Sequence, residues 1–277
     1  MTAKLIAILL AGMALAFAAG YQDEILAWRK SRDAALRAPD GWTSLAGLFW
    51  LREGPNHFGR DAASDIPLPD GPPHAGTFEL RGGQVSVTMD GQTRALKPDS
   101  REGAVTVGRL SLLVIKRGDK YGIRLKDPQS PYRTGFRGIE YFPISEEYRV
   151  TAKWVDAPKQ IPILNILGQT EPSENPGYAV FSLHGREMRL YPIIEAPGDK
   201  QLFYIFRDLT TGKETYPAGR FFYSAMPSNG QVVLDFNKAY NPPCAFTPYA
   251  TCPLPPKENY LPVRVEAGEK TYHAEGH

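Results

Sequence analysis

The sequence is poor in the residues and spacings that metal and nucleotide chemistry need. It has two cysteines, and its five histidines (His57, His74, His184, His273 and His277) form neither a His-x-x-x-His nor a His-Glu-x-x-His motif. A Gly-x-Ser-x-Gly nucleophile elbow, a Gly-rich phosphate loop and a dinucleotide fingerprint are also missing. We therefore expect no metal and no cofactor.

The charge balance has no excess of either sign. The 32 basic and 30 acidic side chains leave a formal charge of +2, and no basic run is interleaved with aromatic residues. Proteins that bind nucleic acids or anionic membranes use such an excess of positive charge. The sequence therefore predicts that no partner is a nucleic acid.

Residues that form turns are abundant. The 277 residues include 26 Gly and 25 Pro, and 42% of them are hydrophobic. This composition is typical of short strands joined by many turns. The chain is long enough for one large β domain or two smaller ones with separate cores. We predict an all-β fold with two modules.

The first 18 residues have the pattern of a secretory signal peptide. Lys4 precedes fifteen uncharged residues, Leu5 to Ala19, and Ala16-Phe17-Ala18 is a small-x-small cleavage signal. The apolar run is short for a bilayer span, so an uncleaved anchor is the alternative, and no cysteine follows it to carry a lipid. We expect cleavage after Ala18, export to the periplasm or the extracellular space, and no membrane span in the mature protein.

Residues 19–40 are predicted to contain a helix, from Tyr21 to Arg37. Ile25 and Trp28 have helical spacing, and Pro39-Asp40-Gly41 ends the pattern. We expect the helix to pack on a sheet through Ile25 and Trp28. A solvated spacer is the alternative, because short isolated helices are marginally stable.

Residues 41–125 have the pattern of a β-sandwich. Short strand-like runs are separated by turn residues such as Arg81-Gly82-Gly83 and Asp90-Gly91, which are typical of hairpins. The predicted strands are Thr43 to Leu51, Gly76 to Leu80, Gln84 to Thr88, Thr93 to Leu96, Ala104 to Val107 and Ser111 to Lys116.

Two short motifs in this module, Phe58-Gly59-Arg60 and Pro73-His74-Ala75, resemble the opening of a forkhead-associated (FHA) domain, a β-sandwich that binds phosphothreonine. Pro72 stands where that family has a serine, and the later Asn-Gly is absent. A phosphate needs several converging donors, of which Arg60 is the one side chain kept. The resemblance implies a degenerate FHA-like fold without phosphopeptide binding, and an unrelated sandwich is the alternative.

Residues 126–277 are predicted to form a second β module, a barrel or sandwich. His184-Gly185 predicts a tight hairpin turn, and the acidic stretch Gln169 to Pro176 an exposed connection. The predicted strands are Tyr148 to Trp154, Ile161 to Leu167, Tyr178 to Leu183, Arg186 to Pro192, Gln201 to Phe206, Arg220 to Ser224, Val232 to Phe236 and Leu261 to Val265.

The stretch Asp235 to Pro256 contains both cysteines and six prolines, too many for a helix or a central strand. Together with Gly41 to Leu51, Glu258-Asn259 and Ala267-Gly268-Glu269, it resembles the DUF1684 family of uncharacterised prokaryotic proteins. The resemblance extends over nearly the whole mature chain. It implies no particular activity, substrate or catalytic residue.

Cys244 and Cys252 are separated by seven residues. Because export leads to an oxidising compartment, we predict a disulfide between them. The alternatives are a zinc site, although structural zinc pairs are more closely spaced, and a nucleophilic cysteine, which needs a base that the sequence does not identify.

Polar residues near the end of the chain form the candidate ligand site. Arg220 lies among aromatic residues on a predicted strand and needs an anionic partner, for which Asp235 and Glu258 are the candidates. Asp208 to Gly212 is predicted to be only a hairpin turn. The candidate binding residues are Arg220, Asp235, Asn237, Tyr240, Asn241, Glu258 and Asn259.

The lack of any nucleophile–base or metal spacing favours a non-catalytic exported protein. Such a protein would bind a small molecule or an envelope component in its second module. The alternative is an exported hydrolase that uses Asp235, Glu258 or Cys244, with Arg220 as the electrostatic partner. Geometry separates the two hypotheses, because two carboxylates that share acid and base roles must open onto one pocket.

Overall fold

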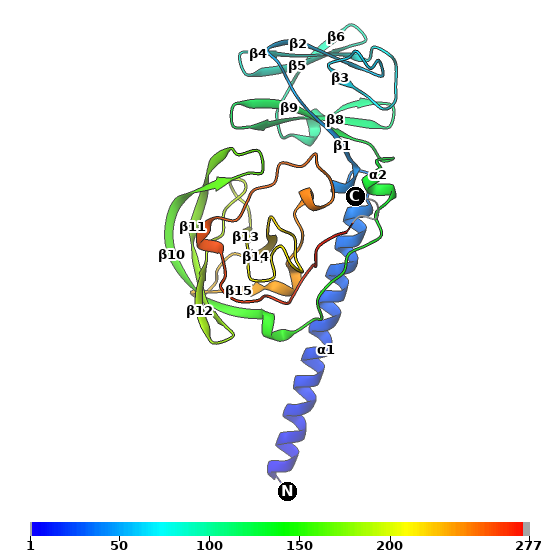
Figure 1. Ribbon diagram of the computed structural model, residues 1–277. Coiled ribbons are helices and arrows are strands. Elements are labelled where there is room, and N and C mark those ends of the chain that lie inside the picture. Colours follow the sequence, from blue (N-terminus) through cyan, green and yellow to red (C-terminus); the bar gives the residue numbers. More distant parts are fainter. Residues whose placement is uncertain (1, 274–277) are drawn as a thin grey trace. The chain divides into compact units, whose positions relative to one another are not determined.

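A computed structural model describes residues 2–273, without the side chains of residues 2–19 and Arg101. The protein is mostly β, which confirms the predicted fold class (Figure 1). The chain forms two compact units. The sandwich unit comprises Leu36–Phe136 and Phe246–Thr251, and the C-terminal unit comprises residues 2–35, Arg137–Ala245 and Cys252–His273.

The sandwich unit consists of a four-stranded sheet, ordered β1-β9-β8-β7, and a five-stranded sheet, ordered β3-β2-β4-β5-β6. Neighbouring strands are antiparallel except β2 and β3. The strands are β1 (Leu45–Trp50), β2 (Gly54–Gly59), β3 (Ile66–Pro67), β4 (Gly76–Arg81), β5 (Gln84–Met89), β6 (Gln92–Leu96), β7 (Val105–Val107), β8 (Leu110–Arg117) and β9 (Lys120–Lys126); the short helices are η1 (Trp42–Ser44), η2 (Arg101–Gly103) and α2 (Pro131–Thr134).

Alternation along these strands builds the core of the sandwich unit. Phe78 and Leu80 of β4 are buried at every second position, and so are Leu112 and Val114 of β8. Because successive side chains of a strand point to opposite faces, the two sheets can share one apolar layer. The buried side chains of both sheets indeed form a single cluster. The FHA resemblance of this unit stays a prediction.

The sandwich unit extends further along the chain than the predicted range, residues 41–125. The backbone N–H of Asp127 donates to the Ser44 carbonyl at 2.8 Å, and the Ser130 hydroxyl donates to the Leu45 carbonyl at 3.2 Å. The turn residues after β9 therefore cap this unit instead of linking two modules. Thr247 also donates to the Leu45 carbonyl, at 3.5 Å, so a segment from late in the chain completes the unit.

The helix α1 (Thr2–Arg37) contains the predicted helix Tyr21 to Arg37. Tyr21 and Ile25 are buried and Trp28 is half-buried. The Tyr21 hydroxyl donates to Asp235 Oδ1 at 2.8 Å. This part of α1 is therefore an integral element of the C-terminal unit, and not a solvated spacer.

The predicted signal peptide, residues 1–18, lies outside the residues whose side chains are described. The helix α1 covers positions 2–18 without a break. Within the described part of the chain, no helix is both long and apolar enough to cross a bilayer. Cleavage after Ala18 and export stay predictions.

The C-terminal unit contains a four-stranded antiparallel sheet, ordered β12-β11-β10-β15, and the hairpin β13–β14. Figure 1 shows β10 and β11 as a long curved hairpin along one side of this unit. The strands are β10 (Arg149–Leu164), β11 (Thr170–Leu183), β12 (Arg186–Leu190), β13 (Gln201–Phe206), β14 (Arg220–Ala225) and β15 (Gln231–Asp235); the short helices are η3 (Glu146–Tyr148), η4 (Phe236–Lys238), η5 (Pro243–Ala245) and η6 (Lys257–Asn259).

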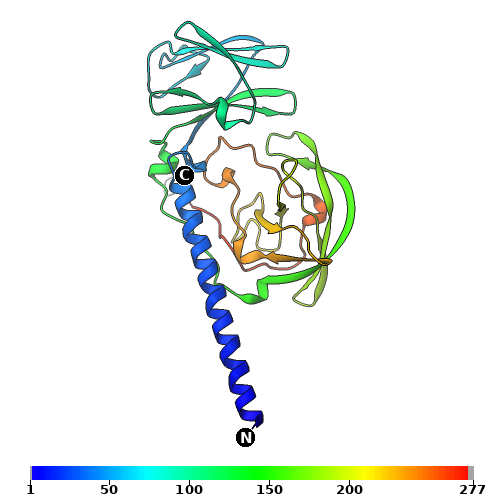
Figure 2. The ribbon, with the colours of Figure 1, turned by 180° about the vertical axis from the view of Figure 1, so that it is seen from behind.

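Both sheets and the end of the chain contribute to one core. Trp154 of β10, Phe181 of β11 and Phe222 of β14 belong to a single buried cluster that also includes Val263 and Val265. The segment after β15 runs around the β13–β14 hairpin, orange to red in the view from behind (Figure 2). Leu261 to Val265, predicted as a strand, is irregular in structure, although it still packs into this core.

The stretch Gln169 to Pro176, predicted as an exposed connection, instead belongs mostly to β11. It pairs with the outer half of β10, where Pro162 lies opposite Pro172. This part of the hairpin has no third strand in regular register, so a proline can occupy a position that needs no N–H donor. The prolines made this stretch look like a loop in the sequence, but its pairing with β10 makes it a strand.

We expect Tyr21→Phe to lower the free energy of unfolding by about 2 kcal/mol, because the buried hydroxyl donates to the Asp235 carboxyl group. The same hydroxyl accepts a hydrogen bond from Asn237 Nδ2 at 2.9 Å, and its loss leaves both partners unsatisfied. Urea unfolding with an unchanged m-value measures the effect. Tyr260→Phe is the control, since Tyr260 is 49% exposed. Equal midpoints for the two variants would contradict the docking of α1 through Tyr21.

Candidate functional site

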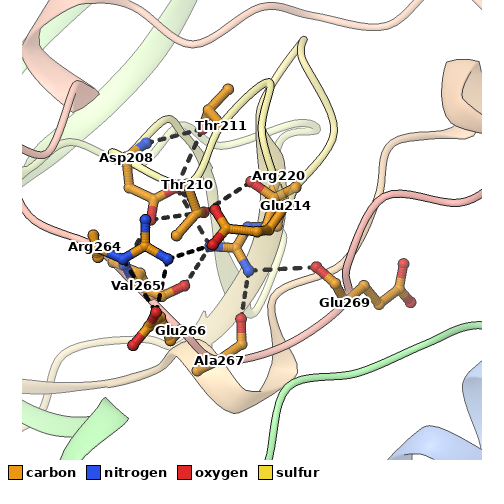
Figure 3. A network of polar contacts seen from close by, with 11 residues as sticks. Asp208, Thr210, Thr211, Glu214, Arg220, Arg264, Val265, Glu266, Ala267 and Glu269 are labelled. Carbon is orange, nitrogen blue, oxygen red and sulfur yellow. Dashed lines mark hydrogen bonds and ion pairs between the residues drawn. The ribbon is translucent and has the colours of Figure 1, made fainter.

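Arg220, the first residue of β14, is buried in the C-terminal unit with 1% of its surface exposed. Its side chain points to the core face of the strand, as Phe222 does two positions later. Nη2 donates to the Val265 carbonyl at 2.9 Å, and Nη1 donates to the carbonyls of Ala267 and Glu269 (Figure 3). One guanidinium thus binds three carbonyl groups of the final segment.

The acidic partner of Arg220 is Asp208, at 3.5 Å, and neither Asp235 nor Glu258 as predicted. Asp208 Oδ2 accepts from the backbone N–H of Val265 at 2.6 Å, and Oδ1 accepts from the Thr210 hydroxyl at 2.8 Å. Burial lowers the pKa of Arg220 and the Asp208 carboxylate opposes this shift. The Asp-x-Thr turn is therefore local structure, as predicted, and also supplies the counter-charge of the buried arginine.

A second buried acid, Glu269, fixes α1 to the C-terminal unit. Arg32 Nε donates to Glu269 Oε1 at 2.9 Å, and the backbone N–H of Asn241 donates to Oε2 at 2.7 Å. Burial raises the pKa of Glu269, whereas Arg32 lowers it. The Arg32 guanidinium also lies 4.6 Å from the centre of the Tyr240 ring. Tyr240 and Asn241 thus form part of the support for the helix.

Asp235 and Asn237 connect three segments of the C-terminal unit. Asp235 accepts from Tyr21 and, at 3.1 Å, from the backbone N–H of Asn237, which caps η4. The Asn237 amide donates to the Ser145 carbonyl at 2.8 Å and its oxygen accepts from the Ser145 N–H at 3.1 Å. Both side chains are saturated by internal partners. They act as structural cross-links and do not form an open site.

Asn259 and Glu258 are neighbours in η6 with opposite environments. Asn259 is 1% exposed; its Nδ2 donates to the carbonyls of Tyr191 and Ile205, and its Oδ1 accepts from the Tyr191 N–H at 2.9 Å. Glu258 is exposed, while Asp235 is buried beside Tyr21. The structure therefore does not bring Asp235 and Glu258 together in the way that the hydrolase hypothesis requires.

Cys244 and Cys252 are both thiols, so the predicted disulfide does not form in this structure. The backbone N–H of Cys244 donates to Cys252 Sγ at 3.2 Å, because Cys244 lies in the turn η5 with its N–H facing the second cysteine. A hydrogen bond from Cys252 lowers the pKa of the Cys244 thiol, as does one from Tyr216, although burial opposes both. The two cysteines thus lie next to each other with no disulfide between them.

Among the described residues, no three His, Cys, Asp or Glu side chains come close enough to hold a metal ion. A small hollow of about 280 Å³ in the sandwich unit is lined by Arg109 and Lys126. Arg109 is already paired with Asp127, at 2.8 Å, and with Asp70. Two carboxylates thus neutralise the positive charge of Arg109, which leaves this side chain without a free charge to attract an anion.

The C-terminal unit has a larger open hollow of about 700 Å³ over β10, β11 and β15. Its lining includes Thr151, Lys153, Ser182, Glu187 and Gln231. All five side chains are exposed, and none takes part in a side-chain hydrogen bond described for the chain. None of the residues predicted to bind a ligand lines this hollow. In the sequence these residues are only the polar positions of alternating strands. Such positions occur on every solvated sheet face, so they do not indicate a ligand site.

We expect Arg220→Ala to lower the free energy of unfolding by about 3 kcal/mol, because it strands the buried Asp208 carboxylate. Chemical denaturation followed by tryptophan fluorescence measures the change. Arg264→Ala is the matched control: Arg264 also pairs with acids, Glu214 and Glu266, but its side chain is 40% exposed and its loss should leave the midpoint nearly unchanged. A stable, fully folded Arg220→Ala variant would show that the buried Arg220–Asp208 pair in Figure 3 is dispensable.

Comparison with known proteins gives a family but no activity. Residues 134–270 match the family described as "Protein of unknown function (DUF1684)". This range is narrower than the predicted resemblance, since Gly41 to Leu51 lies outside it. No curated protein matches the chain.

Among solved structures, the chain is similar to the solution NMR structure of an uncharacterised protein of Haloarcula marismortui. The sequence identity is 33%, the alignment covers 52% of this chain and 81% of that chain, and the TM-score is 0.42. The chain belongs to the DUF1684 family, which it matches from the end of the sandwich unit to the Glu269 that holds α1.

Proposed function

We propose that the protein is exported and acts as a non-catalytic binding protein, with its ligand site in the open hollow over β10, β11 and β15. The observation that carries this proposal is a contrast between two sets of polar residues. Of the predicted site residues, Asp235, Asn237 and Asn259 are hydrogen-bonded to internal partners, and Arg220 is enclosed with 1% of its surface exposed. The polar side chains of the hollow are exposed and without such partners.

The chemistry of the hollow suits a polyhydroxylated ligand, such as a saccharide of the cell envelope. Hydroxyl, carboxamide, amine and carboxylate groups are all present, from Thr151, Ser182, Gln231, Lys153 and Glu187. Sugar hydroxyls both donate and accept hydrogen bonds, so they can use each of these groups. The mixed charge gives no preference for a strongly ionic ligand.

The strand register places these groups in adjacent rows. Lys153 of β10 lies opposite Gln231 of β15 and Val180 of β11, and Ser182 of β11 lies opposite Glu187 of β12. Cross-strand neighbours are about 5 Å apart, which is a spacing that one small ring can bridge. The sheet also fixes the backbone positions of these groups, so only their side chains lose entropy on binding.

The hydrolase alternative finds less support. Asp235 is occupied by Tyr21 and Asn237, and Glu258 is an exposed residue of another element. Arg220, the proposed electrostatic partner, is enclosed by the final segment of the chain. General acid–base catalysis needs two groups within reach of one substrate, whereas Asp235 and Arg220 are occupied by internal partners.

Binding can be tested by thermal shift against a panel of envelope saccharides, because a ligand that binds the native state raises the melting temperature. We expect a shift that disappears in the double variant Thr151→Ala/Gln231→Ala. Glu174→Ala is the control, since Glu174 is an exposed residue of β11 outside the hollow. Binding that survives the double variant unchanged would place the ligand elsewhere. A panel without any shift would contradict the saccharide class.

Export has a separate test. The intact mass of the protein purified from its native host should correspond to a chain that begins at Ala19, because the cleavage signal ends at Ala18. A mass that includes the first 18 residues would favour the uncleaved anchor. Fractionation of the same cells should place the cleaved form outside the cytoplasm.

A further inference from the structure

The Pro-rich stretch brings two thiols together at one point of the C-terminal unit. Cys244 lies in η5, and Cys252 follows the segment Phe246–Thr251, which belongs to the sandwich unit. The Cys244 N–H donates to Cys252 Sγ at 3.2 Å, and neither sulfur takes part in a disulfide. The Cys252 sulfur is therefore held against the backbone of Cys244, eight positions earlier in the chain.

The backbone on both sides of this thiol pair is fixed. Pro243 precedes Cys244, Pro253 follows Cys252, and the Tyr216 hydroxyl donates to the Cys244 carbonyl at 2.9 Å. The Ile166 N–H donates to the Cys252 carbonyl at 3.0 Å. A ligand that uses both sulfur atoms would thus lose little conformational entropy from the protein on binding.

Access differs between the two thiols. Cys252 is 3% exposed, whereas Cys244 is half-buried and can be reached from the surface. An ion can therefore meet the Cys244 sulfur first and complete its coordination at the inner Cys252. The cysteine pair is therefore accessible to solvent on the side of Cys244 and closed on the side of Cys252.

The surroundings restrict which ion fits. No third His, Cys, Asp or Glu is close enough to complete a metal site among the described residues. Zinc takes four ligands in structural sites, and calcium and magnesium take six or more oxygen atoms. Thiolates select soft ions, and a monovalent soft ion such as Cu(I) is satisfied by two sulfur ligands.

We propose that Cys244 and Cys252 form a binding site for one Cu(I) ion, with the two thiolates as its only side-chain ligands. Each thiol loses one proton to solvent as its sulfur–copper bond forms, and the oxidation state of the metal does not change. The bound ion ties together the two ends of the segment Phe246–Thr251. The site is separate from the hollow over β10, β11 and β15, so it stands or falls independently of the proposed saccharide binding.

The test uses the full mature chain, reduced and kept anaerobic, in competition with a chromophoric Cu(I) chelator. We expect one Cu(I) per chain, and loss of that copper in Cys244→Ser and in Cys252→Ser. Tyr260→Phe is the control: Tyr260 is 49% exposed, its loss of a hydroxyl leaves both thiols and their contacts in place, and the stoichiometry should be kept. Zn(II) in the same assay should not be retained, because two ligands do not satisfy it.

A second measurement does not depend on whether the serine variants fold. X-ray absorption of the copper-loaded parent should show two sulfur neighbours and no nitrogen neighbour. Failure of the parent to take up Cu(I), equal uptake by the Cys244→Ser/Cys252→Ser double variant, or a copper with three or more sulfur neighbours would each overturn the proposal. The last result would mean that the ion bridges two chains.

Discussion

The C-terminal unit depends on the burial of one positive charge, the Arg220 guanidinium. A charge in a protein interior is tolerated only when counter-charge and hydrogen-bond acceptors surround it. Asp208 supplies the counter-charge, and the carbonyls of Val265, Ala267 and Glu269 supply acceptors. The turn at Asp208, the strand β14 and the end of the chain must therefore pack together. The final segment can stay irregular because an arginine, and not a neighbouring strand, satisfies its carbonyl groups.

The same principle explains why so many buried polar residues gather in this unit. A Pro-rich stretch cannot satisfy its neighbours through a regular ladder, since each proline lacks an N–H. Asn237 and Asn259 take over that task, each with a carboxamide that both donates and accepts across the gap between segments. Their type and position resemble those of ligand-binding residues, but their partners are backbone groups of the same unit.

The parts of the fold that local patterns control could be predicted from the sequence. Alternation located β4 and β5 closely, because a strand with one buried face repeats every two residues, and short apolar runs located β13 and β14. The outer half of β10–β11 could not be found in this way, since its prolines suggest a loop and only pairing across the hairpin makes it a strand.

The candidate site was harder to predict for a different reason. Several acids could have been the partner of Arg220, and the choice of Asp208 depends on which turn packs beneath β14. The sequence identified the chemically unusual residues, but it could not distinguish those that face inward to hold the fold from those that face solvent. Thr151 and Gln231 are unremarkable by type, and only the shape of the sheet makes them part of a hollow.

The passage of the segment Phe246–Thr251 into the sandwich unit has a consequence for biosynthesis. That unit begins at Leu36, yet it lacks its last piece until more than 200 further residues have been made, as the Leu45–Thr247 hydrogen bond shows with its separation of 202 positions. The partner of Tyr21 arrives 214 positions after it. Neither unit can therefore be completed while the chain is still short, and neither corresponds to a continuous fragment that could be expressed alone. Such non-local closure slows folding.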